Sequence, residues 1–361
     1  MWPRKLKKVI RNPVPQPAVT STPQAQPAQG DWKRTPAVAA LLVCAILLTG
    51  CGQGSEPDQR AGTSNGRALP DENTFSVLSF NLDRFGFDDR TSDGQVVDMK
   101  PEAELQAVFS ILADLRPDIL AVQELGGGDV YATFLDTLTE RGLDYPFHTI
   151  LEQEGSEFHL ALFSRFPFTS LQLHKDDRFT ADGQSFPVKR GFIEADIAVN
   201  PNYSFRIIVA QLKSKAFHPV GHSELRRNEA RILNNWVRRY LGRERRLNLL
   251  VVGDFADPIS SAAMRTITGD QQQFLSPLRL ADAYGDIWTH FDADSDTYHR
   301  YDFMLVSSHM LPEFIPEASS VVRHPKNRLA SNRRPLLAVF HAREMDPHSS
   351  LMLPAYEFDD E

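Results

Sequence analysis

Four polar side chains stand beside short apolar stretches that have the length of β-strands: Asn81, Glu124, Asp254 and Asp302. Carboxylates at strand ends in layered α/β proteins commonly converge on one cleft, where their oxygens bind a hard cation. Each of these residues taken alone could simply cap a turn. Because the placement is repeated along the chain, we interpret the four residues as a candidate catalytic site.

The apolar patterns around these residues predict the elements that position them. Short apolar or alternating runs predict strands, at residues 74–80, 118–122, 159–164, 191–199, 204–211, 249–252, 301–307 and 336–340. Helical periodicity predicts helices that begin after Pro101, near Val130 and at Ser223. Strands outnumber helices, which indicates an α/β protein with sheets packed face to face and helices outside. No linker interrupts this region, so we expect one domain over residues 74–341.

The helix expected over residues 223–241 combines an apolar face with many arginines. The apolar side chains are expected to face the core: Leu225, Ile232, Leu233, Trp236, Val237 and Tyr240. The arginines in and after the helix are expected to point outward: Arg226, Arg227, Arg231, Arg238, Arg239, Arg243, Arg245 and Arg246. A solvated face is the simplest interpretation. Contact with nucleic acid or with anionic lipid headgroups stays open.

Composition excludes several classes of protein. The chain has 361 residues, 42% hydrophobic and 24% charged, as in a globular protein with a substantial core. The formal charge is −8, which argues against non-specific nucleic-acid binding but not against a local basic cleft. The two cysteines, Cys44 and Cys51, cannot build a disulfide framework or a cysteine-based metal site.

The first 73 residues have the composition of a targeting segment. Residues 1–50 are expected to be a leader, because a basic start is followed by the apolar run 37–48, which is too short to span a bilayer. The run ends in Leu48-Thr49-Gly50-Cys51, which resembles a bacterial lipobox, in which the cysteine is acylated. An amphipathic start of the folded domain is the alternative.

This segment predicts a bacterial lipoprotein with Cys51 as its lipidation site and residues 51–73 as a tether. The expected location is the cell envelope, where a lipid anchor in the membrane holds the protein facing the periplasm or the exterior. Residues 342–361 are expected to be an acidic tail.

Several segments, in order along the chain, resemble the signatures of the endonuclease/exonuclease/phosphatase superfamily, which has the DNase I-like fold. They are residues 79–81, 116–124, 162–167, 211–215, 253–257, 288–289, 298–306 and 331–336. The resemblance covers about residues 74–340. It implies a four-layer α/β sandwich of two mixed sheets flanked by helices, with the site at one rim. It also implies hydrolysis of phosphodiesters or phosphomonoesters with a divalent metal, usually Mg²⁺.

The resemblance assigns a role to each position. Glu124 and position 332 would hold the metal, and Asp254 would orient or activate the attacking water. Asn81 and position 256 would contact the phosphate, and Asp302 would support a histidine at position 333. A histidine at position 211 would assist proton transfer or hold the phosphate. Four of these positions differ from the family pattern, and they carry Gln211, Ala256, Asn332 and Arg333.

These replacements change the expected chemistry. Neither Gln211 nor Arg333 can act as a general acid or base near neutral pH. Asn332 and Arg333 also make the site less negative, which is expected to weaken Mg²⁺ binding. Arg333 could pair with Asp302. Together with Arg334, Lys213 and Lys215, it could also bind a phosphate without a metal.

Two functions remain open at this stage. The first is a metal-dependent phosphoesterase with reduced or altered activity. The second is a catalytically degenerate domain that binds a phosphorylated ligand or a protein partner. The substrate, whether a phosphorylated small molecule, a lipid or a nucleic acid, cannot be read from the fold. His218 and His222 have the spacing of metal ligands on a helix, but Pro219 between them disfavours a regular helix.

Overall fold

The computed structural model describes residues 73–86, 99–269, 274–293 and 295–345, and the backbone pairing of two short strands, β1 (Val9–Ile10) and β3 (Val96–Val97). Apart from β1, the expected leader lies outside these residues. So do Cys51, the tether up to residue 72, and the expected acidic tail beyond residue 345. Within the described residues, no helix is both long and apolar enough to cross a membrane.

The first of two six-stranded sheets in the described part of the chain is built around β2. Its order is β17 (Ser320–Val321), β18 (Leu336–His341), β2 (Thr74–Phe85), β4 (Ile119–Gly126), β6 (Phe158–Ser164) and β5 (Phe147–Leu151). Strands β2 and β4 are parallel, and Asn81 pairs with Gln123. Asn81 and Glu124 therefore lie at the same edge of this sheet.

The second six-stranded sheet brings together the carboxylates of the later motifs. Its order is β13 (Leu275–Pro277), β16 (Asp302–Ser307), β12 (Leu249–Asp254), β11 (Tyr203–Gln211), β10 (Phe192–Asn200) and β7 (Phe168–His174). Parallel pairing sets Gln211 opposite Asp254, and antiparallel pairing sets Asp254 opposite Asp302. The register thus places these three side chains in one row at the rim.

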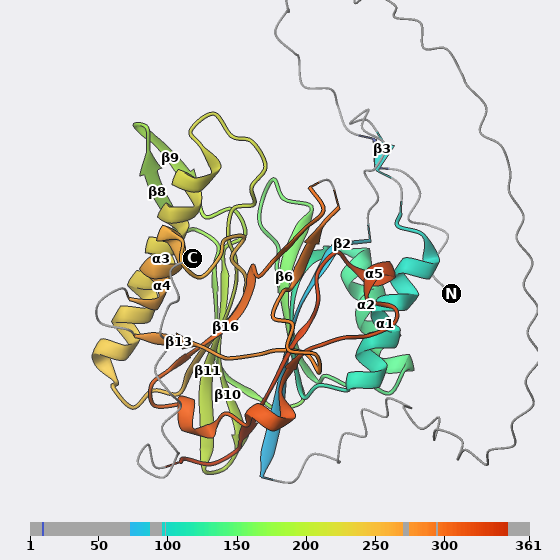
Figure 1. Ribbon diagram of the computed structural model, residues 1–361, viewed down its shortest axis with the longest axis vertical. Helices are drawn as coiled ribbons and strands as arrows, with labels where there is room; N and C mark the ends of the chain where they lie inside the picture. Colours follow the sequence, from blue (N-terminus) through green and yellow to red (C-terminus); the bar gives the residue numbers. More distant parts are fainter. Residues whose placement is uncertain are drawn as a thin grey trace, which may run out of the picture. The chain divides into compact units, whose positions relative to one another are not determined.

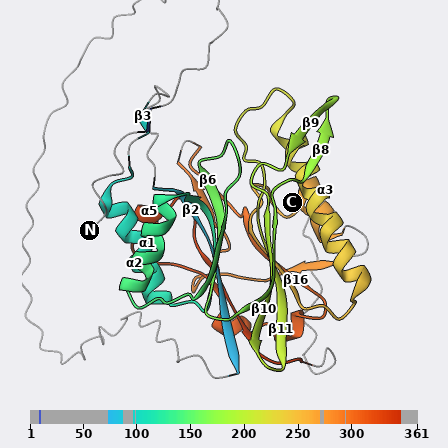
Figure 2. The same ribbon diagram turned by 180° about the vertical axis from the view of Figure 1, so that it is seen from behind.

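Helices cover the outer face of each sheet, as Figures 1 and 2 show from opposite sides. Helices α1 (Glu102–Leu115) and α2 (Asp129–Glu140) share a hydrophobic core with the first sheet, and α5 (Asn327–Ala330) lies beside them. Helices α3 (His222–Arg243) and α4 (Ala262–Thr268) share another core with the second sheet. A further core lies between the two sheets. The predicted four-layer α/β sandwich is therefore confirmed.

The segments with strong apolar periodicity form the elements that the sequence predicts. Pro101 is the N-cap residue of α1, and Leu105, Phe109 and Leu112 form its buried face. Arg116 ends the helix in the left-handed conformation, where its backbone N–H donates to the Leu112 carbonyl. Periodic apolar burial thus determines where α1 lies, and the local backbone determines where it stops.

Several short elements have no clear signal in the sequence. They are β5, β7, β13, β17, the hairpins β8 (Arg178–Ala181) with β9 (Gln184–Pro187) and β14 (His290–Asp292) with β15 (Thr297–His299), the 3₁₀ turns η2 (Leu311–Glu313) and η3 (Pro316–Ala318), and the helices α4 and α5. Strand β7 forms an edge of its sheet, and most of its side chains are partly or fully exposed. Such segments are too short or too exposed to show a periodic pattern of apolar residues in their sequence.

The orientation of one arginine in α3 was predicted wrongly. Leu225, Leu233, Val237 and Tyr240 face the core as expected. Arg226, in contrast, is 1% exposed instead of pointing outward. It donates to Asp257 Oδ1 at 2.8 Å and to the Lys213 carbonyl at 2.9 Å. The ion pair with Asp257 offsets the cost of removing the guanidinium from water. Helical periodicity alone does not reveal such a partner.

Candidate active site

The two sheets bring the four sequence-predicted polar residues together at one rim. Asn81 on β2 donates through Nδ2 to Asp254 Oδ2 on β12 at 3.0 Å and to Glu124 Oε1 on β4 at 3.2 Å. Asp302, at the start of β16, is paired in register with Asp254. Asn81, Asp254 and Asp302 are at most 3% exposed. We call Glu124, Asp254 and Asp302 the carboxylate cluster.

Gln211 donates to the carboxylate cluster from the end of β11. Its Nε2 lies 2.6 Å from Glu124 Oε1, the same oxygen that accepts from Asn81. Among the described residues, no hydrogen-bond partner reaches the buried Gln211 Oε1. Glu124 is therefore held by two neutral amide groups, neither of which exchanges a proton near neutral pH.

Arg333 places a positive charge directly on the other two carboxylates. Its Nη2 lies 2.9 Å from Asp254 Oδ2, and its Nη1 lies 3.6 Å from Asp302 Oδ2. The loop before β18 is fixed by Ser331, whose hydroxyl accepts the Arg333 backbone N–H and donates to the Asn81 carbonyl. The sequence suggested that Arg333 could pair with Asp302, and the structure adds the closer contact with Asp254.

Thr289 holds Asp302 in place, a role that the sequence did not identify. Its hydroxyl donates to Asp302 Oδ2 at 2.6 Å and accepts the backbone N–H groups of Tyr301 and Asp302 at 3.1 Å each. Thr289 is fully buried. The only sequence signal was its place in the Trp288-Thr289 segment that resembles a family signature.

Burial and the neighbouring charges perturb the acids of the cluster. Burial raises the pKa of Asp302 to about 7, although the Arg333 guanidinium acts in the opposite direction. Burial also raises the pKa of Asp254, again opposed by Arg333 and reinforced by the Glu124 charge. Burial alone would lower the pKa of Arg333, but Asp254 and Asp302 raise it above its ordinary value, so Arg333 stays a cation.

The backbone after β12 adopts conformations that few residues tolerate. Gly253 has φ 144°, and a Cβ there would lie 1.8 Å from the Ala210 carbonyl oxygen, so a side chain cannot fit. Ala256 has φ 55°, and its N–H donates to Asp254 Oδ1 at 2.9 Å. Asparagine tolerates this left-handed region better than alanine does. The backbone at position 256 therefore remains suited to the asparagine of the family pattern.

Three residues predicted for the site have other surroundings. Asn332 is exposed, and its backbone carbonyl accepts from the Phe291 N–H. The Lys213 ammonium donates to carbonyls of its own loop, those of Ser214 and Ala216, at 3.2 and 3.1 Å. The Lys215 ammonium contacts the Tyr301 hydroxyl and lies 4.3 Å from the centre of that ring. Lys215 therefore contacts Tyr301, the residue before Asp302 of the carboxylate cluster. Lys213, in contrast, contacts its own loop through its ammonium group.

His290 also lies beside the candidate site, although the sequence gave no reason to select it. It is bridged to Arg333 by backbone pairing, and its ring stacks on Tyr301 with 5.6 Å between centroids. The Arg333 guanidinium lies 5.6 Å from the centre of the same Tyr301 ring. Burial and the Arg333 charge lower the pKa of His290 to about 4, so this imidazole is neutral near pH 7.

The family assignment follows from the sequence match. The sequence model described as the Endonuclease/Exonuclease/phosphatase family matches residues 78–317. The chain belongs to this family. No curated protein matches the chain significantly. The family match spans the strands that carry Asn81, Glu124, Gln211, Asp254 and Asp302.

Several solved structures share the fold of this chain at low sequence identity. The human Nocturnin catalytic domain with bound sulfate is 18% identical, with a TM-score of 0.56 over 74% of this chain and 94% of that chain. An endonuclease/exonuclease/phosphatase from Bacteroides vulgatus is 17% identical, with a TM-score of 0.51 over 75% and 99%. Beta toxin from Staphylococcus aureus is 12% identical, with a TM-score of 0.52 over 73% and 99%.

The donor set does not fit the Mg²⁺ that the family resemblance implies. Glu124 Oε1 faces two amide N–H groups, and Asp254 Oδ2 faces an amide N–H and a guanidinium. Magnesium needs several oxygen ligands in near-octahedral geometry, and a carboxylate oxygen that already accepts two hydrogen bonds has no lone pair left for the ion. In the part of the chain that the structure describes, no three His, Cys, Asp or Glu side chains are grouped so that they could hold a metal ion. Asn332 offers no carboxylate in compensation.

Proposed function

We propose that this protein is an envelope lipoprotein whose phosphoesterase-type domain binds a phosphate ester at Arg333 and has lost most metal-dependent hydrolysis. The single observation that carries the proposal is the position of Arg333, 2.9 Å from Asp254 and 3.6 Å from Asp302. Membership of the family supports a phosphate ester as the ligand class.

Charge explains why Arg333 favours binding over metal-dependent catalysis. A guanidinium between two buried carboxylates supplies the positive charge that a divalent cation would otherwise provide, and it repels such a cation. Arginine also binds phosphate oxygens through paired N–H groups. Lys215, which reaches Tyr301 beside Arg333, is a second cation for the same ligand.

The loss of proton-transfer groups supports weak hydrolysis. Gln211 and Arg333 stand where the family pattern has histidines, and neither exchanges protons near neutral pH. Positioned proton transfer contributes about 10²–10⁴-fold to a rate. His290 is neutral near pH 7, but its Nδ1 lies 3.4 Å from the Asn332 carbonyl and its ring packs on Tyr301. These contacts do not direct His290 at Asp254.

A working metal-dependent hydrolase is the second candidate. This candidate is favoured because the chain retains four residues of the family pattern, Asn81, Glu124, Asp254 and Asp302. Asn81 is hydrogen-bonded to both Glu124 and Asp254. In that case Gln211 and Arg333 would take part in a different mechanism. The two candidate functions differ in whether Mg²⁺ raises the rate at which the wild type hydrolyses a phosphate ester.

Binding of bis(p-nitrophenyl) phosphate to the full chain, measured by calorimetry without added metal, tests the proposal. The wild type is expected to bind, and Arg333→Gln is expected to lose binding. Arg333→Lys, which keeps the charge, is expected to retain part of it. The exposed Arg328→Gln is the control and is expected to bind like the wild type. Absence of binding by the wild type, or binding that survives Arg333→Gln in a folded variant, would contradict the proposal.

Fractionation of cells tests the envelope location separately. Cys51→Ala is expected to release the protein from the membrane fraction or to block its maturation, because it removes the proposed acylation site. Identical soluble fractionation of wild type and variant would show that the lipoprotein assignment is wrong and would leave the phosphate-binding proposal intact.

A further inference from the structure

Helix α3 lies on the outer side of the second sheet (Figures 1 and 2), and its exposed surface is rich in arginine. Seven exposed arginines lie along the helix and in the turn after it: Arg227, Arg231, Arg238, Arg239, Arg243, Arg245 and Arg246. Arg227, Arg231 and Arg238 follow one another at spacings of four and seven residues and so lie above one another, and Arg239 and Arg243, four residues apart, extend the exposed side of the helix around its axis. We call these seven residues the arginine face. The buried Arg226 does not belong to it.

The arginine face carries mostly uncompensated charge. Arg227 is ion-paired with Glu224 at 2.6 Å, and it is the one member for which the described residues supply a carboxylate partner. The guanidinium groups of Arg238 and Arg239 instead lie over the rings of Phe274 and Trp236, at 5.7 and 4.5 Å. A chain with a net charge of −8 has no need of this cluster for solubility.

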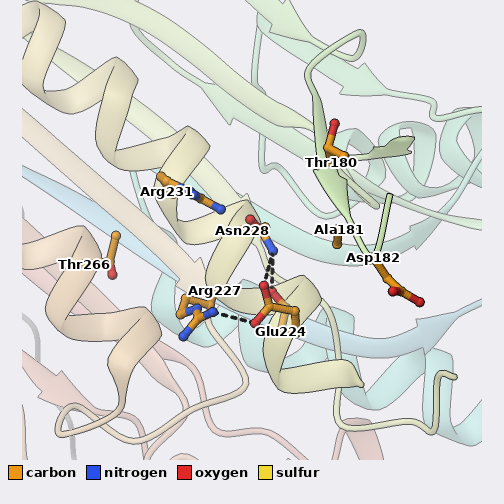
Figure 3. A pocket seen from close by; sticks show the side chains of 8 residues that line it. All are labelled: Thr180, Ala181, Asp182, Glu224, Arg227, Asn228, Arg231 and Thr266. Atoms are coloured by element: carbon orange, nitrogen blue, oxygen red, sulfur yellow. Dashed lines mark hydrogen bonds and ion pairs between the residues drawn. The ribbon is translucent and has the colours of Figure 1, made fainter. Parts of the chain in front are cut away.

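A pocket of about 450 Å³ opens at the N-terminal half of the arginine face. Figure 3 shows that its residues come from the β8–β9 hairpin, α3 and α4. Arg227, Arg231 and the hydroxyls of Thr180 and Thr266 line it, as do the acids Asp182 and Glu224. Asn228 also lines it and is 1% exposed, and its Oδ1 has no hydrogen-bond partner among the described residues. An unpartnered amide oxygen needs a hydrogen-bond donor, so it indicates that the pocket receives a group that carries an N–H or O–H, such as a hydroxyl of a glycerol headgroup.

We propose that the arginine face docks on an anionic phospholipid surface, with one headgroup entering the pocket. The proposal rests on the proposed lipid anchor at Cys51. The 22 residues between Cys51 and Thr74 can span at most about 80 Å, which allows the domain to reach the membrane that holds it. Basic side chains near an anionic surface each contribute to attraction within a Debye length.

The same residues fit a membrane better than a nucleic acid. Proteins that bind single strands interleave exposed aromatic side chains with basic ones, so that bases can stack. On α3, Trp236 is only partly exposed, and its ring is covered by Arg239, stacked on Tyr240 and in tilted contact with His174. The arginine face therefore offers charge without a stacking surface, which suits a layer of phosphate headgroups.

Co-sedimentation with lipid vesicles tests the proposal. The protein used is the full chain with Cys51→Ala, so that no acyl anchor contributes. It is expected to bind vesicles that contain phosphatidylglycerol more strongly than pure phosphatidylcholine vesicles, and to lose this preference as the salt concentration rises. Arg231→Glu combined with Arg243→Glu is expected to reduce binding to the anionic vesicles by about tenfold or more.

The control variant changes the charge equally on another surface. Lys326→Glu with Arg328→Glu alters two exposed cations at α5, beside α1 on the other helical layer, and is expected to bind like its parent. Equal binding by the α3 variant and its parent would overturn the proposal, as would equal loss in both variants. Binding of an oligonucleotide through Arg231 and Arg243 without binding to anionic vesicles would overturn it in favour of nucleic acid. Because Cys51 is replaced in every sample, these outcomes are independent of the anchor.

Discussion

Arg333 places a fixed positive charge where the family pattern has a histidine, which could exchange a proton. Its guanidinium contacts Asp254 and Asp302, both of which are buried and have raised pKa values. Removing one partner from a buried ion pair leaves an uncompensated charge and is strongly destabilising. The local charge balance thus depends on Arg333, as does the proposed phosphate binding. This dependence explains why a single change at position 333 is not expected to restore catalysis.

The buried Thr289 hydroxyl is expected to stabilise the fold through Asp302. Thr289→Val keeps the shape but leaves the Asp302 carboxyl and two backbone N–H groups short of a partner, so the free energy of unfolding should fall by about 1–3 kcal/mol. The loss of this hydrogen bond should also raise the pKa of Asp302 further, since the hydroxyl stabilises the charged form. Urea denaturation measures the first effect.

Thr289→Ser is the matched control, because it keeps the hydroxyl and removes only a methyl group. It is expected to retain more stability than Thr289→Val. A valine variant as stable as the wild type would show that the Thr289 hydroxyl does not support Asp302.

At the scale of elements, buried polar side chains of α3 form hydrogen bonds to the loops around the site and hold them in place. On its buried side Arg226 binds Asp257 and the Lys213 carbonyl. Glu229, one turn further, accepts the backbone N–H groups of Lys189 and Lys213. Burial raises the pKa of Glu229 to about 7, although these N–H groups favour its charged form. Two adjacent charged side chains thus connect α3 to three segments that border β10, β11 and β12.

Replacing Arg226 and Arg227 by methionine, one at a time, compares the buried side of α3, which holds the loops, with its exposed side. Arg226→Met removes a fully buried guanidinium and leaves Asp257 and the Lys213 carbonyl without their partner, so it should lower the free energy of unfolding by about 3–5 kcal/mol. Arg227→Met removes an exposed ion pair and should cost no more than about 1 kcal/mol. Chemical denaturation of both variants measures the difference. Equal losses would contradict the buried position of Arg226.

Strong apolar periodicity is what made the main elements predictable from the sequence. The buried stripe of α1 and the apolar β12 gave correct element types, and the register of β11, β12 and β16 then brought Gln211, Asp254 and Asp302 together. The sequence could not show which partner an arginine selects after folding. The inward position of Arg226 and the closer contact of Arg333 with Asp254 both depend on tertiary neighbours.

The hairpin β14–β15 illustrates the same limit near the site. Its short strands carry mostly half-buried side chains without apolar alternation, so nothing in the sequence predicted that His290 would pair with Arg333. Thr289 lies in a segment that resembles a family signature, but the sequence assigned it no role. Its hydrogen bond joins it to Asp302, 13 residues further along the chain, and forms only on folding.

At the scale of the whole molecule, buried acids make stability depend on pH. Glu313 in η2 is fully buried beside Tyr203, whose hydroxyl donates to it. Burial raises the pKa of Glu313 to about 8. The folded state therefore holds this proton more tightly than the unfolded chain does. The resulting stability is fully present below the unfolded pKa of about 4.3 and is lost as the pH rises through about 8.

Glu313→Gln is expected to weaken the pH dependence of the free energy of unfolding between about pH 5 and 8, where one such group contributes up to about 1.4 kcal/mol per pH unit. The exposed Glu317→Gln nearby is the control and should leave the slope unchanged. Denaturation curves at several pH values provide the measurement. An unchanged slope in Glu313→Gln would show that this carboxyl does not stay protonated in the folded protein.

The most direct test of the account compares Mg²⁺-dependent kcat/KM on bis(p-nitrophenyl) phosphate between the wild type and one combined variant. The variant is Gln211→His, Ala256→Asn, Asn332→Asp and Arg333→His, which restores the family pattern; the left-handed backbone at position 256 accepts the asparagine. Residues that act as a unit are not additive, so the four changes are made together. The account predicts a gain of about 10²-fold or more, with Asp254→Ala in the same background abolishing it. A folded variant without this gain, or a wild type that already hydrolyses the substrate as fast with Mg²⁺, would contradict it.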